Sequence, residues 1–217
     1  MSPVMPRDAL SHIRTWVFDL DNTLYPIEAR LFDQIEVLMT TYVMQALGVD
    51  HAQADHLRGH YWKTHGTTLA GLMREHDLDP LPYLDYVHEI DLSGLSRDPV
   101  LRQNIEALPG RKIVYTNGSR RHAERVLDAR GLAGAFDAIF GIEDANFLPK
   151  PDRAAFETVF KAGAVEHGIA AMFEDDPRNL IVPHEMGLGT VLVGQIAPAP
   201  HVHHQTTDLS AFLARLI

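Results

Sequence analysis

The sequence predicts an α/β protein with a Rossmann-like parallel sheet, helices on both faces, and a small helical cap inserted after the first strand. Two patterns predict the sheet: short apolar segments alternate with longer helical ones, and polar residues follow the apolar segments. The spacing of the strands predicts the cap. Almost one hundred residues separate the first and second strand candidates, whereas a whole βαβ unit needs only about 30 residues.

Each predicted strand is a short apolar segment bounded by polar residues or glycine. The candidates are residues 16–19, 112–116, 138–140, 171–174 and 190–194. Helical segments between and after the later strands are predicted at residues 119–130, 152–162, 177–186 and 208–216. Crossovers of this length suit right-handed βαβ units.

The long interval between the first two strands also has helical periodicity. Apolar side chains recur at close to helical spacing through residues 29–47. Further helices are predicted at residues 51–64, 67–76 and 81–89. Proline and turn residues predict boundaries at Pro26 and at Asp98-Pro99. We therefore expect an α/β core of residues 1–25 and 98–217 and a helical cap of residues 26–97.

The composition excludes several classes of function. The absence of cysteine excludes disulfides, thiolate catalysis and zinc–thiolate sites. No apolar segment approaches the 18 or so residues of a membrane span, and the first residues lack a signal-peptide pattern. The formal net charge of −10 argues against a nucleic acid polymer as partner. We expect a cytoplasmic protein with a small-molecule partner, and the sequence predicts no oligomeric state.

The first strand candidate ends on two aspartates, Asp19 and Asp21. Residues at this spacing on an extended strand point to the same face, so their carboxylates repel each other unless a cation or a shared proton intervenes. Oxygen-rich sites with one or two carboxylates are what Mg²⁺ prefers, and they are typical of phosphoryl chemistry. The alternative is a capped strand end followed by a turn.

Other predicted strand ends carry polar groups that favour the first interpretation, because ligands of open parallel sheets bind beyond the carboxyl ends of the strands. The run Thr116-Asn117-Gly118 offers a hydroxyl and backbone amides at a helix N-terminus, where a phosphate is favoured. The same residues are also compatible with a plain strand-to-helix turn. Lys150 is a point charge in the loop before the next helix, and the fourth strand candidate ends in the acidic run of residues 174–176.

Taken in order, these motifs resemble those of the haloacid dehalogenase superfamily. The run from Phe18 to Tyr25 is similar to its first motif, and Thr116-Asn117-Gly118, Lys150-Pro151 and Glu174-Asp175-Asp176 are similar to the second, third and fourth. Within the superfamily the chain is most similar to the pyrimidine 5′-nucleotidase branch. A softer match to that branch lies in the cap, at Gly66-Thr67-Thr68-Leu69.

The resemblance implies a role for each acidic residue. Asp19 is expected to attack phosphorus and form an aspartyl-phosphate. Asp21 is expected to lend Mg²⁺ its backbone carbonyl and to use its side chain as general acid and base. Asp19 and Asp175 are the expected side-chain ligands of the metal, and in the run 174–176 Asp175 is the direct ligand. Either Glu174 or Asp176 is expected to act through water or by holding the lysine.

The same resemblance implies a phosphate cradle made of Thr116, Asn117, Gly118 and Lys150, with Thr116 and Lys150 counted among the catalytic groups. Residues that could line a slot for the leaving group are Tyr25, Phe32, Tyr61, Trp62, His65, Thr67 and Thr68. Most of these aromatic residues are also typical of a cap core. A histidine cluster at residues 201–204 reads as a solvated loop, and we assign it no function.

The function implied is a Mg²⁺-dependent phosphomonoester hydrolase for pyrimidine nucleoside 5′-monophosphates. A first alternative is a phosphatase or phosphomutase for another small ester, such as a sugar phosphate or phosphoglycolate. A haloacid dehalogenase needs the nucleophile but neither metal nor second aspartate, so Asp21 and the acidic run 174–176 argue against it. A non-catalytic binding protein is expected to lose some of these groups, and here they are all present.

Overall fold

The computed structural model describes residues 6–195, 197 and 199–217. Within these ranges the chain forms one six-stranded sheet in the order β3-β2-β1-β4-β5-β6, and every neighbouring pair is parallel. The strands are β1 (Thr15–Phe18), β2 (Arg111–Tyr115), β3 (Ala138–Phe140), β4 (Ala170–Glu174), β5 (Gly189–Val193) and β6 (His204–Thr206). The predicted parallel α/β fold is confirmed, with β1 in the interior of the sheet between β2 and β4.

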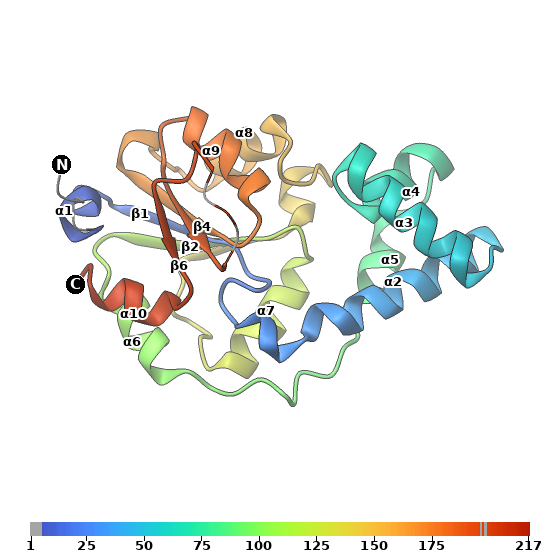
Figure 1. The fold of residues 1–217 in the computed structure, drawn as a ribbon, viewed down its shortest axis with the longest axis horizontal. Helices are drawn as coiled ribbons and strands as arrows, with labels where there is room; N and C mark the ends of the chain where they lie inside the picture. Colours follow the sequence, from blue (N-terminus) through green and yellow to red (C-terminus); the bar gives the residue numbers. More distant parts are fainter. Residues whose placement is uncertain (1–5, 196, 198) are drawn as a thin grey trace.

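Helices cover both faces of the sheet (Figure 1). On one face lie α6 (Pro99–Ala107), α7 (Arg120–Arg130) and α10 (Leu209–Ala214), and on the other lie α8 (Arg153–Ala162) and α9 (Ile181–Glu185). The remaining short elements are α1 (Pro6–Leu10), η1 (Ile27–Ala29), η2 (Ile142–Ala145), η3 (His167–Ile169) and η4 (Pro177–Leu180). None of the helices in the described part of the chain is long and apolar enough to cross a membrane.

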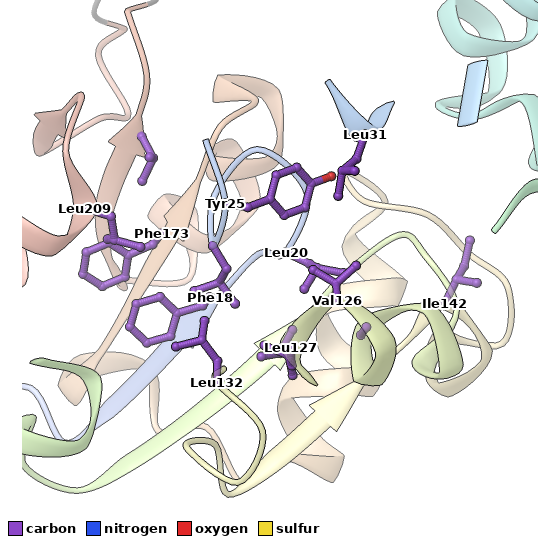
Figure 2. Packing of buried hydrophobic residues seen from close by; sticks show 14 of the residues in the cluster. Phe18, Leu20, Tyr25, Leu31, Val126, Leu127, Leu132, Ile142, Phe173 and Leu209 are labelled. Carbon is purple, nitrogen blue, oxygen red and sulfur yellow. The ribbon is translucent and has the colours of Figure 1, made fainter. Parts of the chain in front are cut away.

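The alternation of side chains along β1 divides the core into two layers. Phe18 belongs to the cluster on the α7 and α10 side, and its ring stacks on Phe173 of β4 with ring centroids 4.7 Å apart. Val17 belongs to the cluster on the α8 side. Figure 2 shows the first cluster close by, with Phe18 and Phe173 beside Leu132 and Leu209. Both faces of β1 are therefore buried, which fixes the position of the loop that follows it.

Beside this core stands a separate group of helices, α2 (Leu31–Leu47), α3 (His51–His65), α4 (Thr68–His76) and α5 (Pro80–Val87) (Figure 1). Tyr61 is fully buried among them. Gly71 of α4 packs on it so closely that an added Cβ would lie 2.1 Å from the Tyr61 ring.

Arg130 of α7 is buried, and its guanidinium joins the two chain segments that lead into and out of this group of helices. It donates to the Leu24 carbonyl at 3.2 Å and to Asp98 at 2.8 Å. One buried side chain thus holds both chain segments that join the core to these helices.

The C-terminal histidine cluster differs from its predicted solvated loop. His204 begins β6, which the sequence analysis did not predict, and His203 Nδ1 lies 2.8 Å from the Thr190 hydroxyl. His201 Nε2 lies 2.7 Å from the carbonyl oxygen of Pro177. Pairing with β5 orders this segment, and a strand of only three residues offers too short a pattern for detection from sequence.

Candidate active site

The polar groups of the four motifs meet at the carboxyl ends of β1, β2 and β4. They line a cavity of about 700 Å³ that continues between the core and the helices α2, α3 and α5. Asp19 follows β1, Thr116 follows β2, and Glu174 is the last residue of β4. Adjacent parallel strands bring these ends to one edge of the sheet, although the residues lie far apart in the sequence.

Lys150 occupies the centre of the site and is almost fully buried. Its ammonium donates to Asp19 at 2.7 Å, to Glu174 at 2.7 Å and to the Tyr115 carbonyl at 3.1 Å. Asn117 holds the lysine backbone from both sides, since its Oδ1 accepts from the Lys150 amide at 2.8 Å and its Nδ2 donates to the Lys150 carbonyl at 3.2 Å. The ammonium is therefore fixed between the two carboxylates.

The arrangement carries more negative than positive charge. Within the described residues, one group of acidic side chains is compact enough to hold a metal ion: Asp19, Glu174 and Asp175, with ligand oxygens all within 4.8 Å of one another. Burial and the neighbouring carboxylate of Glu174 raise the pKa of Asp19, and burial and Asp19 raise that of Asp175. Burial opposes the charge of Lys150, but Asp19 and Glu174 outweigh it and raise the lysine pKa. One ammonium facing three carboxylates leaves a surplus of negative charge that a bound cation would neutralise.

Asp21 is not part of that acidic group. Its Oδ1 accepts from the Tyr25 hydroxyl at 2.7 Å and lies 3.1 Å from His122 Nε2. Burial favours the neutral carboxyl, but the charge and hydrogen bond of His122, the hydrogen bond from Tyr25 and the charge of His88 together outweigh burial and lower the pKa of Asp21 to about 2. The Asp21 side chain is thus ionised and held away from the acidic cluster.

Backbone and hydroxyl groups complete the first and second motifs. The Thr23 hydroxyl donates to Asp19 at 3.0 Å, and Asn22 Nδ2 donates to Asp175 at 3.4 Å. The Gly118 amide donates to the Thr116 hydroxyl at 2.9 Å, and this hydroxyl donates to Asp21 Oδ2 at 3.5 Å. The strand-to-helix turn and a hydroxyl facing the cavity therefore occur together at this motif.

The structure brings together all the residues predicted for the site and decides between Glu174 and Asp176. Glu174 holds Lys150, whereas Asp176, which also lines the cavity, pairs with Arg178 at 2.5 Å. Sequence reasoning missed His122, which contacts Asp21 from α7, and it placed Tyr25 in the leaving-group slot instead of at Asp21. The four-residue spacing of Asp21 and Tyr25 could have predicted their contact. No sequence pattern connects Asp21 with His122, which lies 101 positions away.

The side chains predicted to line the leaving-group slot divide between the cavity wall and the buried interior of the helices α2–α5. Phe32, Trp62, Thr67 and Thr68 line the cavity. Tyr61 is core and its hydroxyl lies 2.7 Å from His76, while His65 lies 2.8 Å from Glu75. Trp62 of α3 contacts the α/β core, because its ring centroid lies 3.8 Å from the guanidinium carbon of Arg178.

Comparison with known proteins shows which chains and folds this protein is similar to. "Phosphate metabolism protein 8" of Saccharomyces cerevisiae is 27% identical over 197 residues, which are 82% of this chain but 61% of that protein, so the chain spans about three fifths of its length. The chain is also similar to the crystal structure of the HAD-hydrolase YfnB from Bacillus subtilis bound to magnesium (TM-score 0.61, 18% identity, 94% of this chain and 98% of that one).

Further similar folds carry both phosphatase and dehalogenase names. A HAD phosphatase from Thermococcus onnurineus has a TM-score of 0.61 at 16% identity over 91% of this chain and 94% of its own. The L-2-haloacid dehalogenase from Xanthobacter autotrophicus has a TM-score of 0.58 at 14% identity over 93% of this chain and 97% of its own. The sequence model of the haloacid dehalogenase-like hydrolases matches residues 13–187. The chain therefore belongs to the haloacid dehalogenase-like hydrolase family.

Proposed function

We propose that this hydrolase is a Mg²⁺-dependent phosphomonoesterase that works through an aspartyl-phosphate on Asp19. The observation that carries the proposal is the buried Lys150 ammonium, 2.7 Å from Asp19, beside an acidic cluster that includes Asp175. A carboxylate can approach an anionic phosphate only where positive charge lies close to both. Mg²⁺, held by Asp19, Asp175 and the backbone carbonyl of Asp21, would neutralise charge on the transferring phosphoryl group.

The side chains divide the reaction into two displacements. A carboxylate oxygen of Asp19 forms a bond to phosphorus while the bond from phosphorus to the leaving oxygen breaks, and Asp21 supplies the proton that this oxygen takes up. In the second step a water oxygen attacks phosphorus, Asp21 accepts the water proton, and the bond to Asp19 breaks. The ionised form of Asp21 is the one that the second step needs. For the first step it must gain a proton, and the negative charge of a bound phosphate ester favours this.

The phosphoryl oxygens have their donors at the second and third motifs. We assign phosphate binding to Thr116, Asn117, Gly118 and Lys150, which all line the cavity. The first three residues directly precede the N-terminus of α7, and the Lys150 ammonium donates to Asp19. Asn117 contributes by fixing the lysine loop, since both of its amide atoms contact the Lys150 backbone. Glu174 holds the ammonium against Asp19 and so acts on the metal site through Lys150.

We further propose residues 26–97 as the cap that selects the leaving group, and a pyrimidine nucleoside 5′-monophosphate as substrate. A cavity of about 700 Å³ is far larger than a phosphoryl group needs and falls within the range of small-molecule sites. Its cap side combines apolar walls at Phe32, Ile35 and Met39 with the polar groups of Thr67 and Thr68. That mixture suits a base and a ribose. Sugar phosphates and phosphoglycolate are smaller alternatives, and a phosphomutase would use the same groups.

Phosphate release from a panel of esters tests the proposal. Uridine and cytidine 5′-monophosphates, a purine nucleotide, a hexose phosphate and phosphoglycolate are each assayed with Mg²⁺ and with chelator, and chloride release is measured from a 2-haloacid. We expect Mg²⁺-dependent phosphate release, fastest from the pyrimidine nucleotides, and none from Asp19→Asn. Chloride release, or phosphate release that survives chelation, contradicts the proposed mechanism.

A further inference from the structure

The Asp21 carboxylate is held by donors from three separate parts of the chain. Tyr25, in the same loop as Asp21, donates to Oδ1 at 2.7 Å, and His122 Nε2 on α7 lies 3.1 Å from that oxygen. The Thr116 hydroxyl, which follows β2, donates to Oδ2 at 3.5 Å. An ionised carboxylate only accepts hydrogen bonds. His122 Nε2 is therefore placed to donate a hydrogen to Asp21.

The His122 ring is fixed in the orientation that this contact requires. Its side chain has no exposed surface, and its backbone amide donates to the Ser119 hydroxyl, which caps α7, at 3.2 Å. The ring stacks on His88, with centroids 4.3 Å apart and an interplanar angle of 12°. A Cβ at Gly118 would lie 3.2 Å from His122 Cδ2, so glycine leaves the space that the ring occupies. Within the part of the chain that the structure describes, Nδ1 has no hydrogen-bond partner, which leaves the bond to Asp21 as the polar contact of the ring.

This contact matters because Asp21 lies two residues from Asp19. Without donors to hold it, a carboxylate so close to the acidic cluster of Asp19, Glu174 and Asp175 is free to turn toward a cation bound there. We propose that His122 is a positioning residue whose N–H fixes the Asp21 carboxylate on the leaving-group side of the site and keeps it out of the metal ligand set. The inference rests on the proposed function, in which Asp21 transfers the proton.

A positioning role makes a prediction that a purely structural role does not. An alkoxide leaving group needs a proton as its bond to phosphorus breaks, whereas p-nitrophenolate spreads its charge over the ring and leaves without one. Misplacing the acid therefore slows an alkyl ester more than p-nitrophenyl phosphate. A general loss of packing slows both esters by the same factor.

The test compares two amide variants, His122→Asn and His122→Gln. The amide nitrogen of glutamine reaches about as far as imidazole Nε2, and that of asparagine does not. The kcat/KM of each variant is measured with uridine 5′-monophosphate and with p-nitrophenyl phosphate. We expect the kcat/KM of His122→Asn to fall by a factor about tenfold larger with the nucleotide than with the nitrophenyl ester. An effect of this size is consistent with the rate acceleration that a general acid provides. His122→Gln is expected to recover most of that difference.

The control is His88→Phe, which replaces the stacked imidazole and removes its 3.0 Å contact with the Ser119 hydroxyl. Because residue 88 has no hydrogen bond to Asp21, this variant is expected to affect both esters by the same factor. Equal losses on both esters in His122→Asn, or no loss, overturn the positioning role. Thermal melting verifies that the variants fold, and His122→Phe replaces His122→Asn where asparagine prevents folding. A wild-type protein that hydrolyses neither ester refutes the proposed function instead, before any variant is compared.

Discussion

The ammonium of Lys150 lies 2.7 Å from a carboxylate oxygen of Asp19, and both residues are almost fully buried. The same ammonium holds Glu174 at 2.7 Å, so one cation compensates two buried carboxylates. Removing a single partner of a buried ion pair leaves an uncompensated charge, which costs far more than the pair contributes. Lys150 therefore supports both the fold and the nucleophile.

We expect Lys150→Met to lower the free energy of unfolding by roughly 3–5 kcal/mol and to abolish turnover. Urea denaturation followed by circular dichroism measures the loss. Adding Glu174→Gln to Lys150→Met removes one of the stranded charges and is expected to restore part of the stability but no activity. A double variant that is less stable than the single one contradicts this account of the site.

Asp175 contributes to the surplus negative charge, which makes its effect on stability depend on metal. We expect Mg²⁺ to raise the melting temperature of the wild type, since an ion at one hundred times its dissociation constant stabilises by about 2.7 kcal/mol. Asp175→Asn relieves the repulsion between the carboxylates of the cluster. Without Mg²⁺ its melting temperature is therefore expected to be no lower than that of the wild type. Adding Mg²⁺ is expected to raise the melting temperature of this variant only slightly. Asp33→Asn, an exposed site on α2, serves as control and is expected to respond to Mg²⁺ as wild type does.

The stack of Trp62 on Arg178 joins the cap to the core at the cavity and is expected to favour the closed site. Cation–π contacts at exposed positions contribute about 0.5–1 kcal/mol. Trp62→Ala is therefore expected to raise KM about two- to fivefold, whereas Trp62→Phe keeps a ring and loses less. The matched control is Val37→Ala, which removes an exposed apolar side chain from the same group of helices. Unchanged KM in Trp62→Ala means that the stack does not contribute to closure.

His88 makes stability depend on pH. Burial, with the charge of His122, lowers its pKa from 6.5 to about 3, so the folded protein keeps this imidazole neutral. Between these values the unfolded chain binds the proton more readily, and stability is lost as the pH falls from about 6.5 toward 3. Between pH 6.5 and 5 the loss from this group is about 2 kcal/mol. Urea unfolding at pH 7.5, 6 and 5 should show a stability difference between wild type and His88→Gln that shrinks toward acid pH. A constant difference contradicts the shift.

The motifs at the strand ends were predictable because parallel strands place their carboxyl ends along one edge. Asp19, Thr116, Lys150 and Asp175 could be assigned to one site from their order in the sequence alone. The strands that precede Asp19, Thr116 and Asp175 were predicted within one or two residues, and Lys150 was predicted in the loop before a helix. The helices of the cap were predictable for a similar reason, since their apolar spacing is a local property. β6 was not predicted, because a strand of three residues is too short to show the alternation of apolar and polar side chains.

The sequence by itself determined which chemical groups gather at the carboxyl edge of the sheet, because strand periodicity and chain order fix that gathering. Only the tertiary structure decided how those groups pair. Glu174 meets Lys150 because it ends β4 inside the sheet, whereas Asp176 lies two residues into the following loop and meets Arg178. His122 meets Asp21 only because α7 packs over the loop after β1, bringing together residues 101 positions apart. Such contacts depend on the angle and depth at which a helix packs, which no local pattern records.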